Sequence, residues 1–489
     1  MRTPRVVADF QGSGVSPRRT NLAGRAVALF ALSLVSLAPA VHAEPEAEDT
    51  APERDHYVEA RSYGTKRETE PPAYVRNLSE TGLPGAEDVT WLDLGLDYRF
   101  RYEFRDDDLR RPTQVTDNPV LLRARAFLAI KEIADPLRFT IEVEDARRYN
   151  SQFAEDDRDV NEMEPIQAFG ELHFEDGLGR GRPLALKGGR FAFEFLDRRL
   201  IARNEWRNTT NTFQGARVQL GQDRNDWNVE LLALQPLERL LSDFDPAIDE
   251  AWFFGAITSW RRWSRVVTLQ PYYLGLDQDQ SARFAVAREI HTVGLRAYGP
   301  TGKTGFDYDV SGLYQFGENG VQDHRAWAVT VDFGYTFDAA WKPRVGVFYG
   351  YATGDEDPTD QESNRFERLF GFARPWSSND YVQMENVNTP KVVVAFEPLK
   401  NLKIDTAYVA YWLASATDRW NSVNLRDPTG RSGTFMGQEY NIRARCPIVS
   451  RVQSNVGYAW FSPGEFPSNL GKGRDSHFVY VELSIDVFE

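Results

Sequence analysis

The sequence predicts an all-β fold: a transmembrane antiparallel β-barrel of about 18 strands, with short periplasmic turns and long extracellular loops. Three observations predict it. Apolar and charged residues alternate along many long segments. The connections between these segments are short and long in turn, and no segment keeps the 3.6-residue period of a helix.

The alternation is clearest in residues 92–105, which read LDLGLDYRFRYEFR. Every second residue is apolar, and the residues between them are charged apart from Gly95. A period of two means an extended strand, here roughly 45 Å long, whereas a soluble strand usually has about five or six residues. Moving the register by one residue would point the charges at lipid, at a cost on the order of ten kcal/mol. One face therefore meets lipid and the other lines a watery lumen.

The same alternation continues to the end of the chain and predicts eighteen strands. They lie near residues 92–105, 120–131, 137–146, 165–174, 183–195, 212–221, 227–235, 251–260, 266–277, 290–299, 306–316, 325–337, 344–352, 390–398, 402–413, 437–446, 452–461 and 477–488. The even-numbered connections are short and the odd-numbered ones are mostly long, with 317–324 intermediate. An even number of strands places both ends of the barrel domain on the short-turn, periplasmic side.

Tryptophans near the predicted strand ends support a membrane-spanning barrel, because such rings gather where lipid meets water. They are Trp91, Trp227, Trp252, Trp260, Trp412 and Trp460. Closure also pairs every strand edge, as a hydrocarbon environment requires. A secreted β-sandwich or propeller is the alternative, and the long strands and alternating loop lengths disfavour it.

The part of the chain before the barrel divides into two segments. Residues 26–37 are apolar but too short to cross a bilayer, arginines precede them, and the small residues of APAVHA follow and end at Ala43. We interpret residues 1–43 as a signal peptide rather than an N-terminal anchor. Residues 44–88 are rich in Glu, Pro and Arg, and we expect a periplasmic lead that is disordered or folds into the pore as a plug. The barrel then occupies residues 89–489.

Composition excludes several classes of function. The 489 residues include 57 basic and 72 acidic side chains, a formal charge of -15, so nucleic acid is not an expected partner. The single cysteine, Cys446, rules out a disulfide or a cysteine-based zinc site within one chain. We expect no cofactor, no metal and no catalytic residues. The acidic segment ATGDEDPTD at 352–360 is interpreted as solvated surface, with calcium binding left open.

Arginines are prominent on the inward face of the predicted strands. The candidate substrate path comprises Arg99, Arg101, Arg123, Arg125, Arg190, Arg217, Arg296, Arg443 and Arg445. A guanidinium is permanently charged and binds a carboxylate through two parallel hydrogen bonds, so a wall of arginines would attract a polyanion and let it step between weak sites. The alternative, which the sequence leaves open, is that inward acids neutralise this wall in structural ion pairs. Those acids are Asp97, Glu103, Glu439 and Glu482.

Four stretches of the chain resemble the alginate export family of outer-membrane barrels. Residues 186–220 read LKGGRFAFEFLDRRLIARNEWRNTTNTFQGARVQL, and residues 349–370 read YGYATGDEDPTDQESNRFERLF. Residues 402–414 and 457–485 are also similar to the family. The resemblance runs from about residue 90 to the end. It implies an eighteen-stranded barrel with an electropositive lumen that passes a polyuronate outward without an energy source of its own.

The resemblance also marks motif residues, some of which are expected to hold a loop against the lumen rather than to touch substrate. They are Asp197, Arg198, Arg199, Trp206, Asn208, Phe213, Gly215, Gly354 and Asp355, together with the inward arginines Arg190 and Arg217. The chain departs from the family pattern at Gln214, where Asp is common, and at its last residues, Val487-Phe488-Glu489.

These features predict a passive outer-membrane pore for the export of an anionic polysaccharide, alginate or a related polyuronate, through an arginine-lined lumen. The expected partners are outer-membrane lipid and the polymer, and periplasmic export components are left open. A general or small-anion porin of the same architecture is the alternative. A polysaccharide-degrading enzyme is disfavoured, because the inward carboxylates Glu142 and Glu144 are neighbours on one strand, with no His or Tyr base paired with them.

Overall fold

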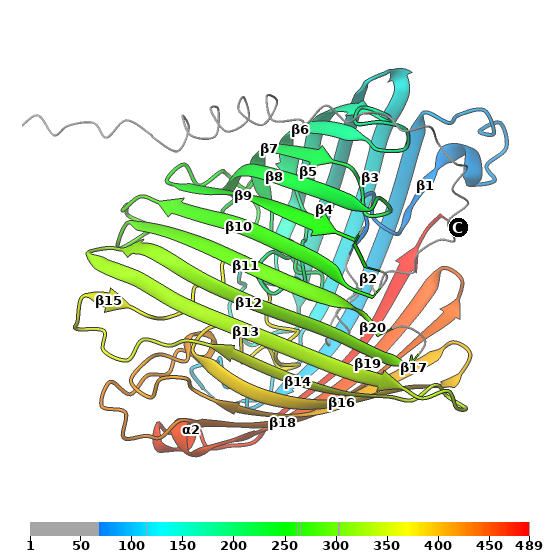
Figure 1. The fold of residues 1–489 in the computed structure, drawn as a ribbon. Helices are drawn as coiled ribbons and strands as arrows, with labels where there is room; N and C mark the ends of the chain where they lie inside the picture. Colours follow the sequence, from blue (N-terminus) through cyan, green and yellow to red (C-terminus); the bar gives the residue numbers. More distant parts are fainter. Residues whose placement is uncertain (1–67, 114, 262, 265, 302–303, 489) are drawn as a thin grey trace, which may run out of the picture. The chain divides into compact units, whose positions relative to one another are not determined.

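The computed structural model describes residues 68–488 apart from 114, 262, 265 and 302–303, so the predicted signal peptide and the first part of the lead lie outside the described residues. In the described part, eighteen long strands form one closed antiparallel sheet (Figure 1). They are β2 (Leu92–Asp106), β3 (Val120–Ala134), β4 (Leu137–Tyr149), β5 (Asn161–Phe174), β6 (Leu184–Phe191), β7 (Phe213–Leu220), β8 (Trp227–Pro236), β9 (Ala251–Trp260), β10 (Thr268–Gln278), β11 (Arg288–Pro300), β12 (Phe306–Asn319), β13 (Gln322–Thr336), β14 (Arg344–Ala352), β16 (Val387–Leu399), β17 (Leu402–Trp412), β18 (Phe435–Val449), β19 (Val452–Pro463) and β20 (Ser476–Asp486). The predicted eighteen-stranded barrel is confirmed.

Shorter elements lie before and between these strands. They are β1 (Val75–Asn77), the 3-10 helices η1 (Leu78–Glu80) and η3 (Asn421–Val423), β15 (Glu362–Ser363) and α2 (Glu465–Asn469). β15 pairs in parallel with β13. Among the described residues, no helix is long and apolar enough to cross a membrane.

The barrel closes between its first and last long strands. Each long strand pairs antiparallel with the next, and β2 pairs with β20, with Tyr102 opposite Val481. β20 pairs with β2 only from Asp97 onward, and β1 pairs with the earlier residues, with Val75 opposite Gly95. The connections form one rim of mostly short turns and one rim of mostly long loops, as the sequence predicts. We call these the short-turn rim and the long-loop rim.

The two faces of the barrel wall differ as the alternation predicts. On β2, the side chains of Arg99 and Arg101 are buried, whereas the neighbouring rings of Tyr98 and Tyr102 are exposed. Exposed apolar side chains recur along the other strands, for example Phe139, Val293, Trp327 and Val392. The outer face is therefore apolar, and the ionic side chains point into the barrel.

Two long connections turn from the long-loop rim into the barrel interior. They are the β6–β7 loop (192–212) and the β14–β16 loop (353–386). The loops bind each other, because the N–H of Phe370 donates to the carbonyl of Leu200 at 2.9 Å. Their apolar side chains pack with inward residues of the wall in a large buried hydrophobic cluster. These loops fill the middle of the barrel.

Strand ends differ from the predicted ones where this inner layer begins. β6 ends at Phe191, whereas the predicted segment continues to residue 195. Phe193 and Phe195 lie beyond the strand end and enter the buried cluster. The apolar residues continue at every second position beyond the end of β6, because the first part of the loop buries Phe193 and Phe195 in this cluster.

Candidate functional site

Glu205, in the β6–β7 loop, is the counter-ion of the arginines on β3. Its carboxylate accepts hydrogen bonds from Arg125 at 2.9 Å, from Arg123 at 3.2 Å and from Arg203 of its own loop at 3.2 Å. The Glu205 side chain is 9% exposed and that of Arg125 is 1% exposed. Burial alone raises the pKa of the Glu205 carboxyl, but the arginine charges outweigh it and hold the pKa well below its usual value. The carboxylate is a buried, charged anchor of the loop.

The two arginines of β2 bind the backbone of the same loop. Arg99 donates to the carbonyl oxygens of Glu205 and Arg207 at 2.6 and 2.7 Å. Arg101 donates to the carbonyl oxygen of Trp206 at 2.6 Å. The four predicted arginines of β2 and β3 are therefore brought together, and they lie buried beneath the loop that they hold.

Three of the four predicted neutralising acids lie beside these arginines. Glu103 and Glu482 form ion pairs with Arg101 at 2.8 and 3.2 Å. Asp97 lies 3.7 Å from Arg123. These acids therefore neutralise arginines of the wall, and the same arginines also bind the β6–β7 loop.

The fourth acid, Glu439 on β18, binds the β14–β16 loop instead of the arginine wall. It accepts hydrogen bonds from the Ser377 hydroxyl at 2.7 Å, from the N–H of Ser378 at 2.8 Å and from the amide side chain of Asn379 at 3.0 Å. A wall carboxylate therefore anchors the second inner loop through neutral donors.

Glu142 and Glu144 on β4 also hold the β6–β7 loop. Arg203 donates to Glu142 at 3.0 Å, and Arg125 donates to Glu144 at 2.8 Å. The hydroxyl of Thr210 donates to Glu144 at 2.7 Å. Each carboxylate is engaged by basic and polar partners from the wall and the loop.

Trp206, a motif residue, lies between two guanidiniums. The Arg101 guanidinium carbon lies 4.2 Å from the ring centroid, and that of Arg374 lies 3.5 Å from it. The Tyr480 ring meets the indole edge-on, with 4.7 Å between centroids. Cations over an aromatic face are attracted by its quadrupole, so this stack joins the β6–β7 loop, the β14–β16 loop and the wall.

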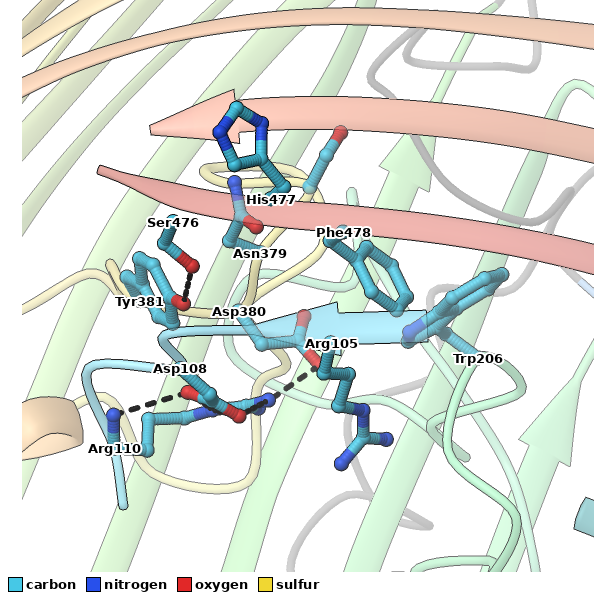
Figure 2. Close-up of a pocket in the computed structure, with 11 residues that line it drawn as sticks. Arg105, Asp108, Arg110, Trp206, Asn379, Asp380, Tyr381, Ser476, His477 and Phe478 are labelled. Atoms are coloured by element: carbon cyan, nitrogen blue, oxygen red, sulfur yellow. Dashed lines mark hydrogen bonds and ion pairs between the residues drawn. The ribbon is translucent and has the colours of Figure 1, made fainter. Parts of the chain in front are cut away.

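Figure 2 shows a small pocket beside Trp206, where long-loop-rim segments meet. In it Arg110 donates to Asp108 at 2.7 Å, and the hydroxyls of Tyr381 and Ser476 are 2.5 Å apart. The pocket has a volume of about 20 Å³, which is room for about one water molecule. It is a polar junction between loops.

The motif residues at the start of the β6–β7 loop bind within the inner layer. Asp197 accepts a hydrogen bond from the N–H of Arg199 at 3.0 Å, and it pairs with the guanidinium of the same residue. That guanidinium lies 5.0 Å from the Phe348 ring, and the guanidinium of Arg198 lies 5.6 Å from the Phe372 ring. These residues shape the loop and are buried.

Asn208 and Phe213 fix the far end of the same loop. The Asn208 side-chain amide donates to the carbonyl of Leu122 at 2.9 Å, and its oxygen accepts from Arg99 at 3.1 Å. The Phe213 ring packs edge-on against Phe370, with 4.9 Å between centroids. Asn208 therefore attaches this end of the loop to β3, and Phe213 packs against the β14–β16 loop.

The motif glycines occupy positions where a side chain has no room. A Cβ at Gly215, whose φ is +152°, would lie 2.2 Å from the carbonyl oxygen of Ala233. A Cβ at Gly354 would lie 2.0 Å from Oδ1 of Asn386. The N–H of Asp355 donates to a carboxylate of the next long loop at 2.9 Å. In the described part of the chain, no group of three His, Cys, Asp or Glu side chains is placed to hold a metal ion.

Four of the other predicted arginines face acids on neighbouring strands. The pairs are Arg190–Glu164, Arg296–Asp309 at 2.8 Å, Arg443–Asp405 at 2.8 Å and Arg445–Asp405 at 2.9 Å. They are spread around the wall, so the structure does not bring them together with the cluster on β2 and β3. Arg217 lines a cavity at the short-turn rim.

A cavity of about 390 Å³ lies at the long-loop rim. Its charged lining comprises Arg101, Arg105, Arg110, Arg111, Arg158 and Arg207 against Asp156, Asp159 and Asp380. Burial, and then the nearby charge of Arg158, lower the pKa of Arg207 to about 9. Arginines outnumber acids in this lining, although Glu103 and Asp108 pair with three of the arginines from beside the cavity.

A second cavity, of about 590 Å³, lies at the short-turn rim. Its charged lining comprises Lys131, Arg138, Lys187, Arg217 and Arg224 against Glu68, Glu70, Asp93, Glu171, Asp223 and Glu230. The β6–β7 loop contributes Phe195 and Leu196 to this cavity, and Trp206 and Arg207 to the other one. The loop therefore lies between the two cavities. Residues 68–72 of the N-terminal lead also line the second cavity.

Sequence reasoning missed Glu205, Arg203 and Arg158, because long connections have no period that assigns a side chain to one face. One signal was present. Residues 191–201 read FAFEFLDRRLI, which is too apolar for a loop that stands in solvent. That composition is typical of a segment that is buried, here within the barrel.

A family model described as alginate export matches residues 90–482 of the chain. No curated protein matches the sequence at a significant level.

The fold is similar to that of Pseudomonas aeruginosa proteins with solved structures. OpdO shares 15% identity over 81% of this chain and 96% of that chain, with a TM-score of 0.54. OccK2 (OpdF), crystallised in complex with glucuronate, shares 11% identity over 81% and 96%, with a TM-score of 0.54. The outer membrane protein OprD shares 12% identity over 80% and 93%, with a TM-score of 0.51. At identities this low, the similarity establishes a shared fold and nothing further.

Proposed function

Because the chain belongs to the alginate export family and has the fold of outer-membrane porins, it is a passive outer-membrane channel, and we propose that its solute is an anionic polysaccharide, alginate or a related polyuronate. The long-loop rim is then extracellular and the short-turn rim periplasmic. No chemical conversion is required of the wall, which supplies position and charge.

The observation that carries the proposal is the arginine-rich cavity at the extracellular rim. A polyuronate presents one carboxylate on each sugar, and a guanidinium binds a carboxylate with two parallel hydrogen bonds. Several arginines around one cavity offer alternative partners, so a chain can move from one weak contact to the next. Basic side chains also line the periplasmic cavity, among a similar number of acidic ones, and they offer the polymer further partners for its carboxylates at that end.

The buried arginines have a different part in this proposal. Arg99, Arg123 and Arg125 are held by Glu205 and by loop carbonyls, and they position the β6–β7 loop between the cavities. Arg101 does both, because it binds the loop and also lines the extracellular cavity. Substitutions at these three buried arginines are therefore expected to change stability before they change ion preference.

A small-carboxylate channel is the second candidate, and the filled interior favours it. The two inner loops pack across the middle of the barrel, with the cavities on either side of the β6–β7 loop. A monomeric uronate needs less room than a polymer to pass such a layer. Glucuronate, found with the fold relative OccK2, is therefore a suitable monomer probe.

Single-channel recording with uronates of increasing length separates the two candidates. We expect soluble oligouronates to interrupt the current, with interruptions that lengthen as the chain lengthens, because each added carboxylate adds a contact. A channel for small carboxylates would respond to glucuronate and ignore the longer chains. Recovery of the oligouronates without new chain ends would further separate a channel from a cleaving enzyme.

A double substitution tests the extracellular cavity itself. Arg158 is exposed in this cavity, and Arg111 lies 3.6 Å from Asp156, so Arg111→Gln with Arg158→Gln removes charge with little effect on packing. Loss of these two contacts should make the oligouronate interruptions about tenfold shorter at most. Arg431→Gln, on an exposed loop position, is the matched control. Unchanged interruptions and an unchanged reversal potential in a salt gradient would contradict the proposed role of the cavity.

A further inference from the structure

The N-terminal lead places one carboxylate on two buried cations in the periplasmic cavity. Glu70 accepts a hydrogen bond from Nη2 of Arg217 at 3.1 Å and one from Nζ of Lys187 at 3.1 Å. A second nitrogen of Arg217 reaches the oxygen that Lys187 binds, at 3.3 Å. Both carboxylate oxygens are therefore bound, in the manner of a ligand in a site.

The two cations are fixed by the wall and its aromatic neighbours. Lys187 on β6 is opposite Arg217 on β7, and their side chains are 8% and 3% exposed. The Arg217 guanidinium lies 4.8 Å from the Phe193 ring, and Nζ of Lys187 lies 5.7 Å from the Phe169 ring. Glu230 lies 3.6 Å from Arg217 and offsets part of its charge. The positions of the cations follow from strand pairing and packing, independently of Glu70.

The lead is held more lightly than the cations are. The Glu70 side chain is 40% exposed. On one side of it the N–H of Glu68 donates to Glu194 at 2.6 Å, and on the other the Tyr74 hydroxyl donates to Glu142 at 2.7 Å. Pro71 and Pro72 separate Glu70 from Tyr74 and stiffen the segment. Water and solutes therefore have access to the carboxylate but little access to its partners.

We propose that Lys187 and Arg217 form a carboxylate-binding site at the periplasmic mouth, occupied at rest by Glu70 of the chain's own lead and able to exchange it for the carboxylate of a uronate-type solute. The class of solute rests on the proposed function, whereas the internal occupancy does not. The adjoining cavity of about 590 Å³ gives a solute room to approach the two cations. Release of Glu70 removes the ion pairs that draw residues 68–74 across this cavity.

Hydrogen exchange of the lead tests the internal occupancy without any solute. The N–H of Ala73 donates to the Glu68 side chain at 2.8 Å and the N–H of Val75 donates to the Pro72 carbonyl at 3.0 Å, so both amides report on the folded lead. In the full-length protein in detergent, Glu70→Gln should make these amides exchange about fivefold faster, because it replaces a charged partner at a partly exposed site. Glu87→Gln, an exposed acid of the same lead, is the matched control and should change nothing.

A solute arm of the same experiment tests the ligand class. Excess sodium glucuronate should speed exchange of the lead in the wild-type protein, whereas sodium chloride at equal ionic strength should do so less. Lys187→Gln should raise the basal exchange and remove the glucuronate response. Glu70 and Glu87 lie outside the strands, and Lys187→Gln changes one inward side chain of β6 without removing a backbone pairing, so each variant is expected to keep the barrel.

The outcomes are separable from those for the proposed function. Exchange in Glu70→Gln that equals the wild-type rate would overturn the internal occupancy. Faster exchange in Glu70→Gln, with no response of the wild type to glucuronate beyond that to chloride, would overturn the solute site. Oligouronate interruptions at the extracellular cavity are measured separately, so either result leaves the proposed function to its own test.

Discussion

Glu205 and Glu70 are two carboxylates that reach the barrel wall from segments outside the strands, and they differ mainly in their exposure to water. Glu205 is 9% exposed and is bound by three arginines in the middle of the barrel. Glu70 is 40% exposed and is bound by one arginine and one lysine at the periplasmic rim. A buried charge left without its partner is costly, whereas an exposed ion pair contributes little. The same chemistry therefore fixes a loop in one region and permits exchange in the other.

The largest effect is expected from Glu205→Gln. The substitution keeps the shape of the side chain but leaves Arg123, Arg125 and Arg203 without their shared counter-charge. We expect the free energy of unfolding to fall by about 3–5 kcal/mol. Urea unfolding from lipid vesicles, followed by tryptophan fluorescence, measures it. Glu80→Gln, an exposed acid, is the control. A loss no larger than that of the control would break the contrast between the two regions.

Asn208→Ala should have the next largest effect. Its amide donates to the carbonyls of Leu122, Arg147 and Asp159, and these acceptors would lose a buried donor. The expected loss in unfolding free energy is about 1–3 kcal/mol, with faster hydrogen exchange in residues 192–212. Asn421→Ala, whose exposed amide makes a 3.3 Å bond, should have little effect. An equal effect of both variants would argue against a rigid inner loop.

Acid should release the lead from its two cations. Burial alone raises the pKa of Glu70, but Arg217 and then Lys187 outweigh it and hold the pKa well below its usual value. A lowered pKa means that the contact is fully present above the ordinary glutamate value of about 4.3 and is lost progressively as the pH falls below it. Hydrogen exchange of residues 73–75 at pH 7, corrected for intrinsic rates, should therefore be slower than at about pH 3.5.

Two further titrating groups, Glu68 and Glu194, lie in or beside the lead, and a variant separates their contribution from that of Glu70. Burial raises the pKa of Glu194 to about 7, and this residue accepts from the N–H of Glu68. Glu70→Gln keeps Glu68 and Glu194 and loses the Glu70 titration. The difference between wild type and variant should therefore be about fivefold at pH 7 and vanish at low pH. A difference that persists at low pH would exclude Glu70 as the titrating group.

The smallest effect is expected for the global stability of Glu70→Gln. The lead contacts the wall at its rim, and the strands keep their pairing without it. The unfolding free energy should change by less than about 0.5 kcal/mol, although the lead itself becomes more mobile. A loss comparable to that of Glu205→Gln would mean that the lead is part of the folded barrel, and the comparison between the two regions would fail.

The barrel could be predicted because its residues repeat with a period of two. In residues 92–105 each apolar side chain has a charged neighbour, and the structure places the two kinds on opposite faces. Loop length also alternates between the rims as predicted. Both signals are local in the sequence, so no knowledge of the interior is needed to recognise them.

The interior could not be predicted in the same way, because its partners are far apart in the chain. Arg125 meets Glu205 eighty residues later, and nothing near either residue indicates the other. The inward position of Glu439 leaves it open as a partner of the arginine wall, and in the structure it binds the β14–β16 loop instead. Inward direction follows from the period, whereas the identity of the partner depends on how the loops fold.

β1 limits how far the residues before it can move away from the barrel wall. Its pairing with β2 fastens the chain at Val75, five residues after Glu70. Five residues span at most about 17 Å, so a detached Glu70 stays within reach of its two cations. A short tether of this kind gives an effective concentration on the order of millimolar. A uronate in the periplasm would have to exceed that threshold to compete, and the mouth would then respond to accumulated solute rather than to traces of it.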